Sequence, residues 1–460
     1  MDEGHFSYLG TRLPACHVAR VSQPLVVPTS PLQIADYRRY WLARFLATFA
    51  TLSMVVLIAY QTYDVARADY GMGLRDAAFM LGLLGAAQFF PLLLLTPVAG
   101  LAADRFDRRR VVLFANLIDC GIALVIAIAT ARDALTLPLL FGLAAAHGSA
   151  RVFNGPALSA IAPNIVPPSL LPKAIALSSM GWQVATVVGP AAGGFLFAAS
   201  HSLPYFVSAG LLLASGLLIS SIPPMRAVHD GPPAHPLRQI ADGFAFVRRE
   251  RFLLGCVTLD LFAVLLGGAT AMLPVFARDI LTWSNGTPIG PEGLGLMRGA
   301  PAAGATLVAA WLSWKPLENN VGVKMLWAVV AFGAATVAFA LSRNFALSLG
   351  LLALLGAADM ISVFIRNSLV QLNTPDAMRG RVSAINGLAI SASNELGELQ
   401  SGLMAGLLGA AGAVAFGGVG AIVVTALWAV IFPELRRAKT FDSSFLHPVT
   451  GPNDTREPAT

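Results

Sequence analysis

AAFMLGLLGAAQFFPLLLLTPVAG (residues 77–100), LAADRFDRRR (101–110) and VVLFANLIDCGIALVIAIATA (111–131) follow one another in this chain. The first and third segments are apolar, and the second is charged. A helix needs about 20 apolar residues to cross the hydrocarbon core of a bilayer, and both apolar segments reach that length. We therefore predict two membrane-spanning helices that are joined by a short, basic loop.

The composition of the whole chain also indicates a membrane protein. Of its 460 residues 56% are hydrophobic and only 12% are charged, whereas soluble domains carry about 25% charged residues. Its 43 glycines suit a protein in lipid, where small residues let helices approach closely. Cys16, Cys120 and Cys256 lack the spacing of a zinc site or a disulfide framework. We expect no metal site and no cofactor.

Apolar stretches of this length recur along the chain. They cover residues 41–63, 77–100, 111–131, 134–156, 174–199, 203–222, 253–279, 293–313, 321–341, 345–371, 382–408 and 411–432. A proline-rich, charged stretch separates the first six from the last six. We predict an all-α polytopic membrane protein whose twelve transmembrane helices form two pseudo-symmetric six-helix bundles.

This pattern divides the chain into five parts. They are a disordered cytoplasmic N-terminal extension (1–33), an N-terminal bundle (34–222), a cytoplasmic central loop (223–252), a C-terminal bundle (253–432) and a cytoplasmic C-terminal tail (433–460). No basic segment followed by an apolar run begins the chain, so we expect no cleaved signal peptide.

Lysine and arginine fall mainly on one side of this topology. With both termini inside, the outside turns hold only a few of them: Arg67, Arg75, Arg132, Arg278 and Arg343. Cytoplasmic loops collect positive residues, so we predict a multi-pass inner-membrane protein with both termini in the cytoplasm. This asymmetry also accounts for the net charge of +6 without nucleic-acid binding.

The two halves resemble each other. Gly85 and Pro91 recur as Gly295 and Pro301, an offset of 210 residues in each case. Repeated halves in a transporter place the substrate site at their interface, near the middle of the bilayer.

Five residues of the first basic loop carry a recognisable motif. Gly100, Asp104, Arg105, Arg108 and Arg109 have the spacing G-x-x-x-D-R-x-x-R-R, which resembles the loop signature of the major facilitator superfamily. The glycine permits a close helix crossing, the aspartate suits a helix N-terminus, and the arginines can pair across the interface between the halves. We interpret the loop as a cytoplasmic gate. A plain positive-inside stop signal is the alternative.

A second motif lies in the fifth apolar stretch. Gly189, Pro190, Gly193 and Gly194 resemble the antiporter motif that marks exporters in this superfamily, although Ala185 stands where the pattern usually has glycine. Proline removes a backbone donor, and the glycines offer a smooth face to a partner helix. The motif favours export, and a packing face without bearing on direction is the alternative.

Longer segments indicate a narrower group. YWLARFL (40–46), LPVFARD (273–279) and SNELGE (393–398) resemble the enterobactin-exporter-like group, also called the transmembrane secretion effector family, over residues 35–437. This resemblance implies a proton-driven exporter of a small amphiphilic molecule, siderophore-like or drug-like. We expect the chain to be a monomer. Ala144 stands where the superfamily's fourth-span motif has arginine, so proton coupling would have to use other residues or be absent.

Charged residues inside the apolar stretches are candidates for proton or cargo binding, because a charge at the centre of a membrane helix costs roughly 2.5–3.5 kcal/mol. The candidates are Asp119, Asp260, Arg298, Asp359, Arg366, Glu395 and Glu398. Static ion pairs between helices are the alternative role for the carboxylates.

Two spacings within this set are informative. Glu395 and Glu398 are three residues apart and share a helix face, where one of the two tends to keep its proton. Asp359 and Arg366 are seven residues apart and project from one side of their helix. Arg366 lies nearer a cytoplasmic end, as do Arg44 and Arg151, and for these arginines we expect snorkelling or a gating network.

An amphiphilic cargo requires an apolar pocket with few polar groups. The side chains that could line it, with ordinary packing as the alternative, are Phe49, Met54, Gln88, Trp182, Gln183 and Asn386.

Three other functions compete with export. An ATP-driven pump needs a Gly-Lys pair in its phosphate-binding loop, and this chain has none. A membrane-embedded enzyme could use Asp359 and Glu395 as an acid–base pair with His147 as a base, but no H-E-x-x-H or G-x-S-x-G motif occurs, so we expect no enzyme. An uptake symporter shares the fold and most of the charges, and it is the nearer alternative.

Overall fold

The computed structural model describes residues 28–224, 236–315 and 317–441, and all regular elements in these residues are helical. The first group of helices contains η1 (Pro31–Gln33), α1 (Ala35–Ala68), α2 (Leu74–Arg105), α3 (Arg108–Ala131), α4 (Leu137–Ser159), α5 (Ala162–Ile165), η2 (Pro168–Leu170), α6 (Leu171–Ala199) and α7 (Leu203–Ser220). The prediction of an all-α chain is confirmed for the described residues.

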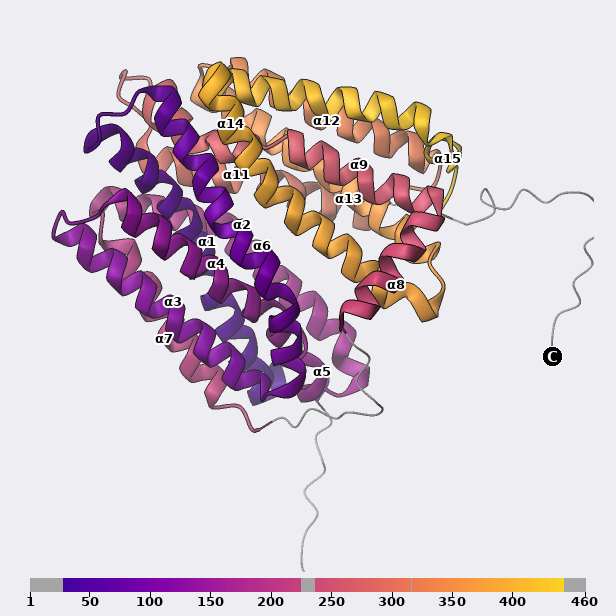
Figure 1. Ribbon diagram of the computed structural model, residues 1–460. Coiled ribbons are helices and arrows are strands. Elements are labelled where there is room, and N and C mark those ends of the chain that lie inside the picture. The colour runs from indigo at the N-terminus through magenta and orange to yellow at the C-terminus, as the bar shows by residue number, and fades with distance from the viewer. Residues whose placement is uncertain (1–27, 225–235, 316, 442–460) are drawn as a thin grey trace, which may run out of the picture.

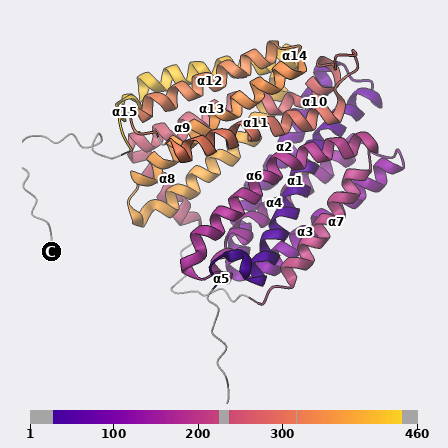
Figure 2. The same ribbon diagram turned by 180° about the vertical axis from the view of Figure 1, so that it is seen from behind.

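The second group begins at residue 236. It contains α8 (Pro236–Arg249), α9 (Arg251–Leu266), η3 (Ala269–Met272), α10 (Leu273–Val275), the π-helical segment η4 (Phe276–Ile280), α11 (Gly290–Trp314), α12 (Val321–Leu341), α13 (Phe345–Leu372), α14 (Asp376–Ile431) and α15 (Pro433–Arg437). The two groups meet at one end and diverge toward the other (Figures 1 and 2).

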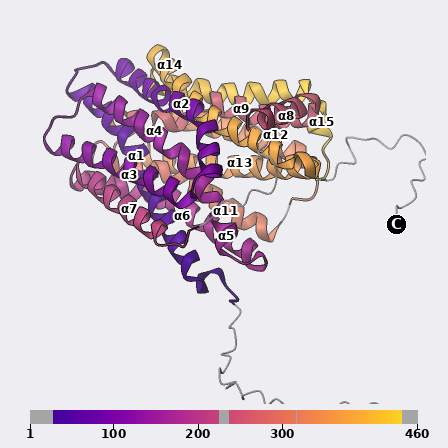
Figure 3. The ribbon, with the colours of Figure 1, turned by 60° about the horizontal axis from the view of Figure 1, so that its bottom comes forward.

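The predicted central loop contains a helix in the structure. Residues Pro236–Arg249 form α8, which lies beside α9 and α14 at the far end of the second group (Figure 3). Val247 of this helix is buried while Phe244 is exposed, so α8 packs one face on the second group. The predicted N-terminal extension falls mainly on residues 1–27, and most of the predicted C-terminal tail falls on residues 442–460; both lie outside the described residues.

Nine segments of the described chain are long and apolar enough to cross a membrane. The predicted spans 134–156 and 293–313 correspond to α4 and α11, which are not among the nine; α4 holds His147 and Arg151, and α11 holds Glu292 and Arg298. The last two predicted spans share α14, which is interrupted at Gly409 with φ 76° and ψ 165°. Glycine adopts a positive φ at little cost, and it stands in the two-residue gap between the predicted spans.

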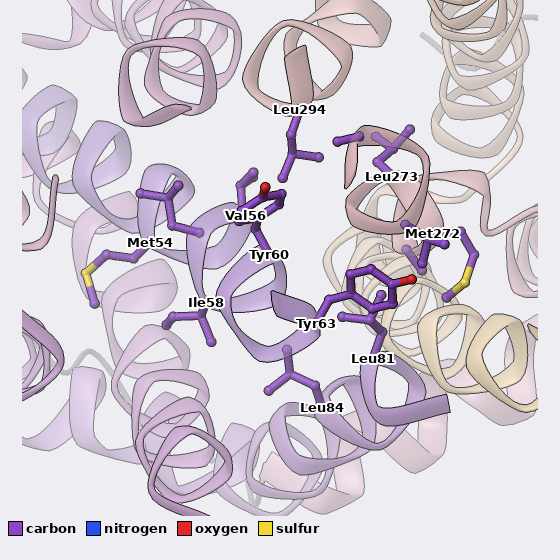
Figure 4. Close-up of a cluster of buried hydrophobic side chains, with 14 of the residues drawn as sticks. Met54, Val56, Ile58, Tyr60, Tyr63, Leu81, Leu84, Met272, Leu273 and Leu294 are labelled. Atoms are coloured by element: carbon purple, nitrogen blue, oxygen red, sulfur yellow. The ribbon is translucent and has the colours of Figure 1, made fainter. Parts of the chain in front are cut away.

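Buried apolar side chains are shared between the groups at one end only of the described molecule. There one cluster combines Tyr60 and Leu84 of the first group with Leu273 and Leu294 of the second (Figure 4). We call this the converging end; it includes the α1–α2 connection and Gly409. At the diverging end, which includes α5 and α8, each group has a separate cluster of its own.

Close contacts at glycine residues also distinguish the converging end from the diverging end. A Cβ atom added to Gly82 on α2 would lie 2.7 Å from the Cα atom of Gly402 on α14, and one added to Gly295 on α11 would lie 2.5 Å from the carbonyl oxygen of Pro190 on α6. Toward the diverging end, a Cβ atom on Gly100 or Gly387 would meet no atom within 4 Å. Since close backbone approach is a main source of helix association in lipid, these crossings hold the two groups together at the converging end.

Candidate transport site

A small cavity lies between the two groups of helices. It has a volume of about 20 Å³, and its walls come from α1, α2, η3, α10, α11 and α14. Most of its lining is apolar, and the polar side chains among it are Gln88, Thr270, Arg298 and Glu398. The Arg298 guanidinium on α11 lies 3.6 Å from the Glu398 carboxylate on α14. This space would hold roughly one water molecule.

Glycines position the polar side chains of this cavity. A Cβ atom on Gly85 of α2 would lie 2.8 Å from the Glu398 Cβ atom, so the missing side chain makes room for the glutamate. In the same way, a Cβ atom on Gly148 of α4 would lie 3.2 Å from the Cα atom of Gln88. Both glutamine and glutamate can therefore sit between closely packed helices.

Glu395 lies one helical turn from Glu398, on the side of the diverging end. The charged groups that act on it are Glu398, Arg151 of α4 and Arg298 of α11. We call Arg151, Arg298, Glu395 and Glu398 the central cluster. It joins both groups of helices and contains equal numbers of positive and negative side chains. The predicted candidates Arg298, Glu395 and Glu398 are thus brought together.

The candidates Asp260, Asp359 and Arg366 lie elsewhere, inside the second group. The Arg366 guanidinium forms an ion pair with the Asp260 carboxylate of α9, and both charges act on Asp359. Of the two roles expected for Arg366, a gating network stays a prediction. Snorkelling toward an aqueous surface is wrong for this structure, because Arg366 is only 2% exposed. Its guanidinium instead turns toward two carboxylates within its own bundle.

Asp119 is separate from both of these places. Its Oδ1 atom lies 2.9 Å from Nδ1 of His147, and both side chains are fully buried between α3 and α4. Neither residue lines the cavity between the groups. The sequence did not predict this pairing. Asp119 and His147 lie on different helices, and only the packing of α3 on α4 brings them together.

A charged contact that the sequence did not reveal joins the two groups at the converging end. The Arg278 Nε atom lies 3.0 Å from Asp64 Oδ1, and the Arg67 Nε atom lies 3.7 Å from Asp279 Oδ2. The Tyr63 hydroxyl donates a hydrogen bond of 2.6 Å to the same Asp279 oxygen. We call these five residues the converging-end latch. The signal that could have found it is that two of the few predicted outside arginines, Arg67 and Arg278, each have an aspartate nearby in sequence.

The residues of the predicted gate loop bond differently. Arg108 donates to the carbonyl oxygen of Ala160 at 3.0 Å, while Arg109 pairs with Asp107 at 2.6 Å and also donates to the Ile222 carbonyl. All of these partners belong to the first group. The expected pairing across the interface is therefore wrong for this structure, because the two groups diverge at this end.

The other members of that motif lie at the end of α2, a helix that contacts α8 of the second group. Arg105 is exposed, and Gly100 lies at no close helix crossing, contrary to expectation. The side chain of Asp104 lies outside the described residues. Asp107 caps the start of α3 by accepting a hydrogen bond from the Arg109 amide. Burial raises the pKa of Asp107, but its hydrogen bonds to Arg109 outweigh this effect, and the pKa is lowered below its ordinary value.

The glycines of the second motif are buried and lie against two helices rather than one. A Cβ atom on Gly189 would lie 3.0 Å from the Phe49 carbonyl oxygen of α1, and one on Gly193 would overlap the Ser53 hydroxyl of the same helix. A Cβ atom on Gly194 would overlap the Pro291 carbonyl of α11. Pro190 lies within α6, which continues through it. The motif therefore packs α6 on its own group and on the second group at once.

The residues that were predicted to line a cargo pocket do not lie together in the structure. Gln88 lines the cavity, Gln183 donates a 2.7 Å hydrogen bond to Thr306 of α11, and Asn386 donates to Asn367 of α13. The remaining three are Met54 in the shared core, Phe49 packed on Phe45, and the half-exposed Trp182.

Known proteins are similar to this sequence over most of the chain. A family model described as transmembrane secretion effector matches residues 26–454. The enterobactin exporter EntS of Citrobacter koseri is 27% identical over 412 residues, covering 87% of this chain and 92% of that protein. The enterobactin exporter EntS of Shigella boydii serotype 18 is 25% identical over 410 residues, with the same coverage.

Solved structures share the fold at lower identity. A mutant form of the nucleoside transporter NupG is 15% identical, with a TM-score of 0.66, and the match covers 86% of this chain and 100% of that one. An inward-facing bacterial homologue of the human lysosomal transporter Spinster is also 15% identical, with a TM-score of 0.63, covering 87% of this chain and 96% of that one. At these identities the likeness concerns the fold alone.

Proposed function

Because this chain belongs to the transmembrane secretion effector family, we propose that it is a proton-coupled exporter of a small amphiphilic molecule, siderophore-like or drug-like. It is a membrane transporter of the major facilitator type and not an enzyme. It is also a multi-pass protein of the inner membrane. The exporter works as a monomer, and its ligands are the cargo and protons.

Twelve spans in two six-helix bundles complete this proposal. Nine apolar segments, the more polar helices α4 and α11, and the division of α14 at Gly409 support that number. The first and last described residues, 28 and 441, and the basic gate loop belong to the diverging end, so the positive-inside rule favours the cytoplasm for that end. The structure then corresponds to an inward-facing state, closed toward the outside by the converging-end latch.

The observation that carries the proposal is the ion pair between Arg298 and Glu398, which lies in a cavity between the two bundles. Buried charges inside a membrane usually contact a partner or a ligand, and this pair lies where repeated halves place their substrate site. Because the cavity holds roughly one water molecule, it must widen before it can hold cargo. The surrounding apolar wall suits an amphiphile.

Export rather than uptake is supported by two observations. Gly194 of the α6 motif packs against α11 across the interface between the bundles, where a motif that governs opening must act. The curated relatives are named exporters of enterobactin. The test below distinguishes export from uptake by a symporter.

The test uses enterobactin as the probe cargo, in cells that lack their own enterobactin exporter. We expect the wild-type chain to restore secretion and inverted membrane vesicles with an acidic interior to accumulate the compound. Arg298→Gln should reduce the transport rate at least tenfold, which corresponds to about 1.4 kcal/mol. Arg343→Gln, which removes an arginine bonded only to backbone carbonyls, should stay within about twofold.

Two outcomes would contradict the proposal. Accumulation in right-side-out vesicles driven by external acid would indicate uptake symport. If enterobactin and a panel of amphiphilic dyes all fail to move, whatever gradient is imposed, the export of amphiphiles itself is refuted.

A further inference from the structure

The charged side chains inside the described helices form clusters, and one of these clusters is unbalanced. The central cluster contains two arginines and two glutamates, and the converging-end latch contains two arginines and two aspartates. In the first bundle, the one carboxylate of Asp119 contacts one basic side chain, that of His147. Asp260, Asp359 and Arg366, which we call the α9–α13 cluster, combine two carboxylates with one guanidinium. With both carboxylates ionised this cluster carries a net charge of −1.

The two carboxylates of the α9–α13 cluster differ in their contacts. Asp260 is paired with Arg366, which is almost fully buried. Asp359 has no ion pair among the described residues, although the charges of Asp260 and Arg366 both act on it. Both aspartates line a cavity of about 10 Å³ together with Ser362. The negative charge without a direct partner is therefore that of Asp359, and it faces a small internal space.

The groups around Asp359 are few. Helix α9 presents Asp260 and, next to Arg366, the buried thiol of Cys256. Helix α12 contributes the apolar Val329 and Phe332 to the cavity. Helix α11 approaches α13 through Pro301, which lies against Gly356 one turn before Asp359. The charged groups of α14, Glu395 and Glu398, interact with Arg151 and Arg298 instead.

We propose that the α9–α13 cluster is the proton-binding site of this transporter, separate from its cargo site, and that Asp359 is the group that binds the proton. This inference rests on the proposed proton-coupled export. One proton moves from water to an Asp359 carboxylate oxygen, the cluster changes from a net charge of −1 to neutral, and the same proton later leaves to the other side. No residue lining this cavity also lines the cavity between the bundles.

The position of Asp359 connects this proton to the cargo site. Asp359 lies on α13, which packs closely on α11 at Gly356 and Gly304, and α11 carries Arg298 of the central cluster. An ionised Asp359 attracts the Arg366 side chain and repels Asp260, and protonation removes both forces at once. A change in the packing of α9 on α13 is therefore transmitted to α11 without contact between cargo and proton site.

Infrared difference spectroscopy of the full chain in liposomes tests the proton site without any cargo. A pH step from about 8 to about 5 should produce carbonyl bands of newly protonated carboxyl groups, and one of these bands should belong to Asp359. Asp359→Asn should remove this band, and Asp359→Glu should restore one at a shifted frequency. Ser362→Ala, a substitution in the same cavity without change of charge, and Glu398→Gln, in the other cavity, should both retain it.

Transport measurements then separate this inference from the proposed function. Asp359→Asn should abolish enterobactin accumulation driven by a proton gradient, yet keep downhill exchange within about threefold, since the central cluster is intact. A band that persists in Asp359→Asn, or that is lost only in Glu398→Gln, overturns the proton site even if export is proton-driven. A band that Asp359→Asn removes supports the site even if imposed proton gradients fail to drive export, in which case the proposed coupling alone is refuted.

Discussion

The two ends of the molecule hold their charged side chains in opposite ways. At the converging end, Arg67 and Arg278 cross-link two bundles by pairing with Asp279 and Asp64. At the diverging end, Arg108 and Arg109 bond within the first bundle, to Ala160, Asp107 and Ile222. At both ends, arginines lie near helix termini. The difference is whether the partner belongs to the other bundle.

This contrast indicates how one chain could alternate between two states. Side chains of the latch are partly exposed, with Asp64 at 40% and Arg278 at 23%, and one such pair contributes about 1 kcal/mol or less. A shared apolar core and glycine crossings reinforce the pairs at the same end. No single contact is so strong that the bundles could not separate. We expect the gate loop to form contacts across the interface if the diverging end closes.

Of the changes predicted here, reversing one charge of the converging-end latch should have the largest effect on the balance between the two states. Arg278→Asp places a carboxylate beside Asp64 and next to Asp279, so attraction becomes repulsion at the converging end. We expect a shift of about 1–3 kcal/mol toward the state that is open at this end, or roughly a tenfold to hundredfold change in the ratio of the two states. Distances between spin labels on α1 and α11 would measure it.

A charge exchange provides the control for this prediction. The double variant Asp64→Arg with Arg278→Asp restores opposite charges at the 3.0 Å contact and should recover most of the original distribution. If the single variant leaves the distances unchanged, the latch is incidental to closure. If the double variant is no better than the single one, the effect is not electrostatic.

A smaller effect is expected at the glycine crossings that accompany the latch. Gly194→Ala introduces a methyl group where the Pro291 carbonyl lies, and overpacking of this kind costs about 1–3 kcal/mol. Part of that cost is relieved by displacement of α11, so we expect up to a tenfold loss of transport. Gly210→Ala on α7, whose Cβ would meet no atom within 4 Å, is the matched control. Equal loss in both variants would show that lipid-facing packing, not the crossing, is responsible.

The sequence was sufficient for most of the fold. Apolar length located the helices, and the gap at residues 409–410 between two predicted spans coincides with the interruption at Gly409. Hydropathy was less informative for α4 and α11, whose polar and small residues lower the average. The repeat relating Gly85 to Gly295 correctly marks two helices that meet the opposite bundle, because both positions are places of close backbone approach.

The candidate site was less predictable. Spacing along one helix linked Glu395 with Glu398 and Asp359 with Arg366, but it could not reveal that Asp260 of another helix supplies the direct partner of Arg366. The latch was missed for a related reason: Asp64 and Arg278 are 214 residues apart, and only the packing of the bundles brings them together. A motif also cannot specify the conformation, so the gate loop was expected in contact and is found open.

The smallest effect is expected at the diverging end, where the contacts are local to the first bundle. Asp107 caps α3 and pairs with Arg109, and its pKa is lowered below the ordinary value of 3.8. A lowered pKa means that the unfolded chain takes up protons first on acidification, so this contribution to stability is present above about pH 4 and is lost as the pH falls through the lower, folded-state value. Asp107→Asn keeps the capping oxygen and loses only the charge, so the loss at neutral pH should stay below about 1 kcal/mol, and it should vanish in strong acid. Asp107→Ala loses the cap as well, at a further cost of about 1 kcal/mol that does not depend on pH.

Thermal unfolding of the purified protein in detergent at neutral and acidic pH measures the loss of stability in both variants. Neither variant should alter the distances between α1 and α11, because no bond of Asp107 crosses to the second bundle. If Asp107→Asn moved those distances as far as Arg278→Asp does, the loop would already be acting between the bundles, and the contrast between the two ends would fail.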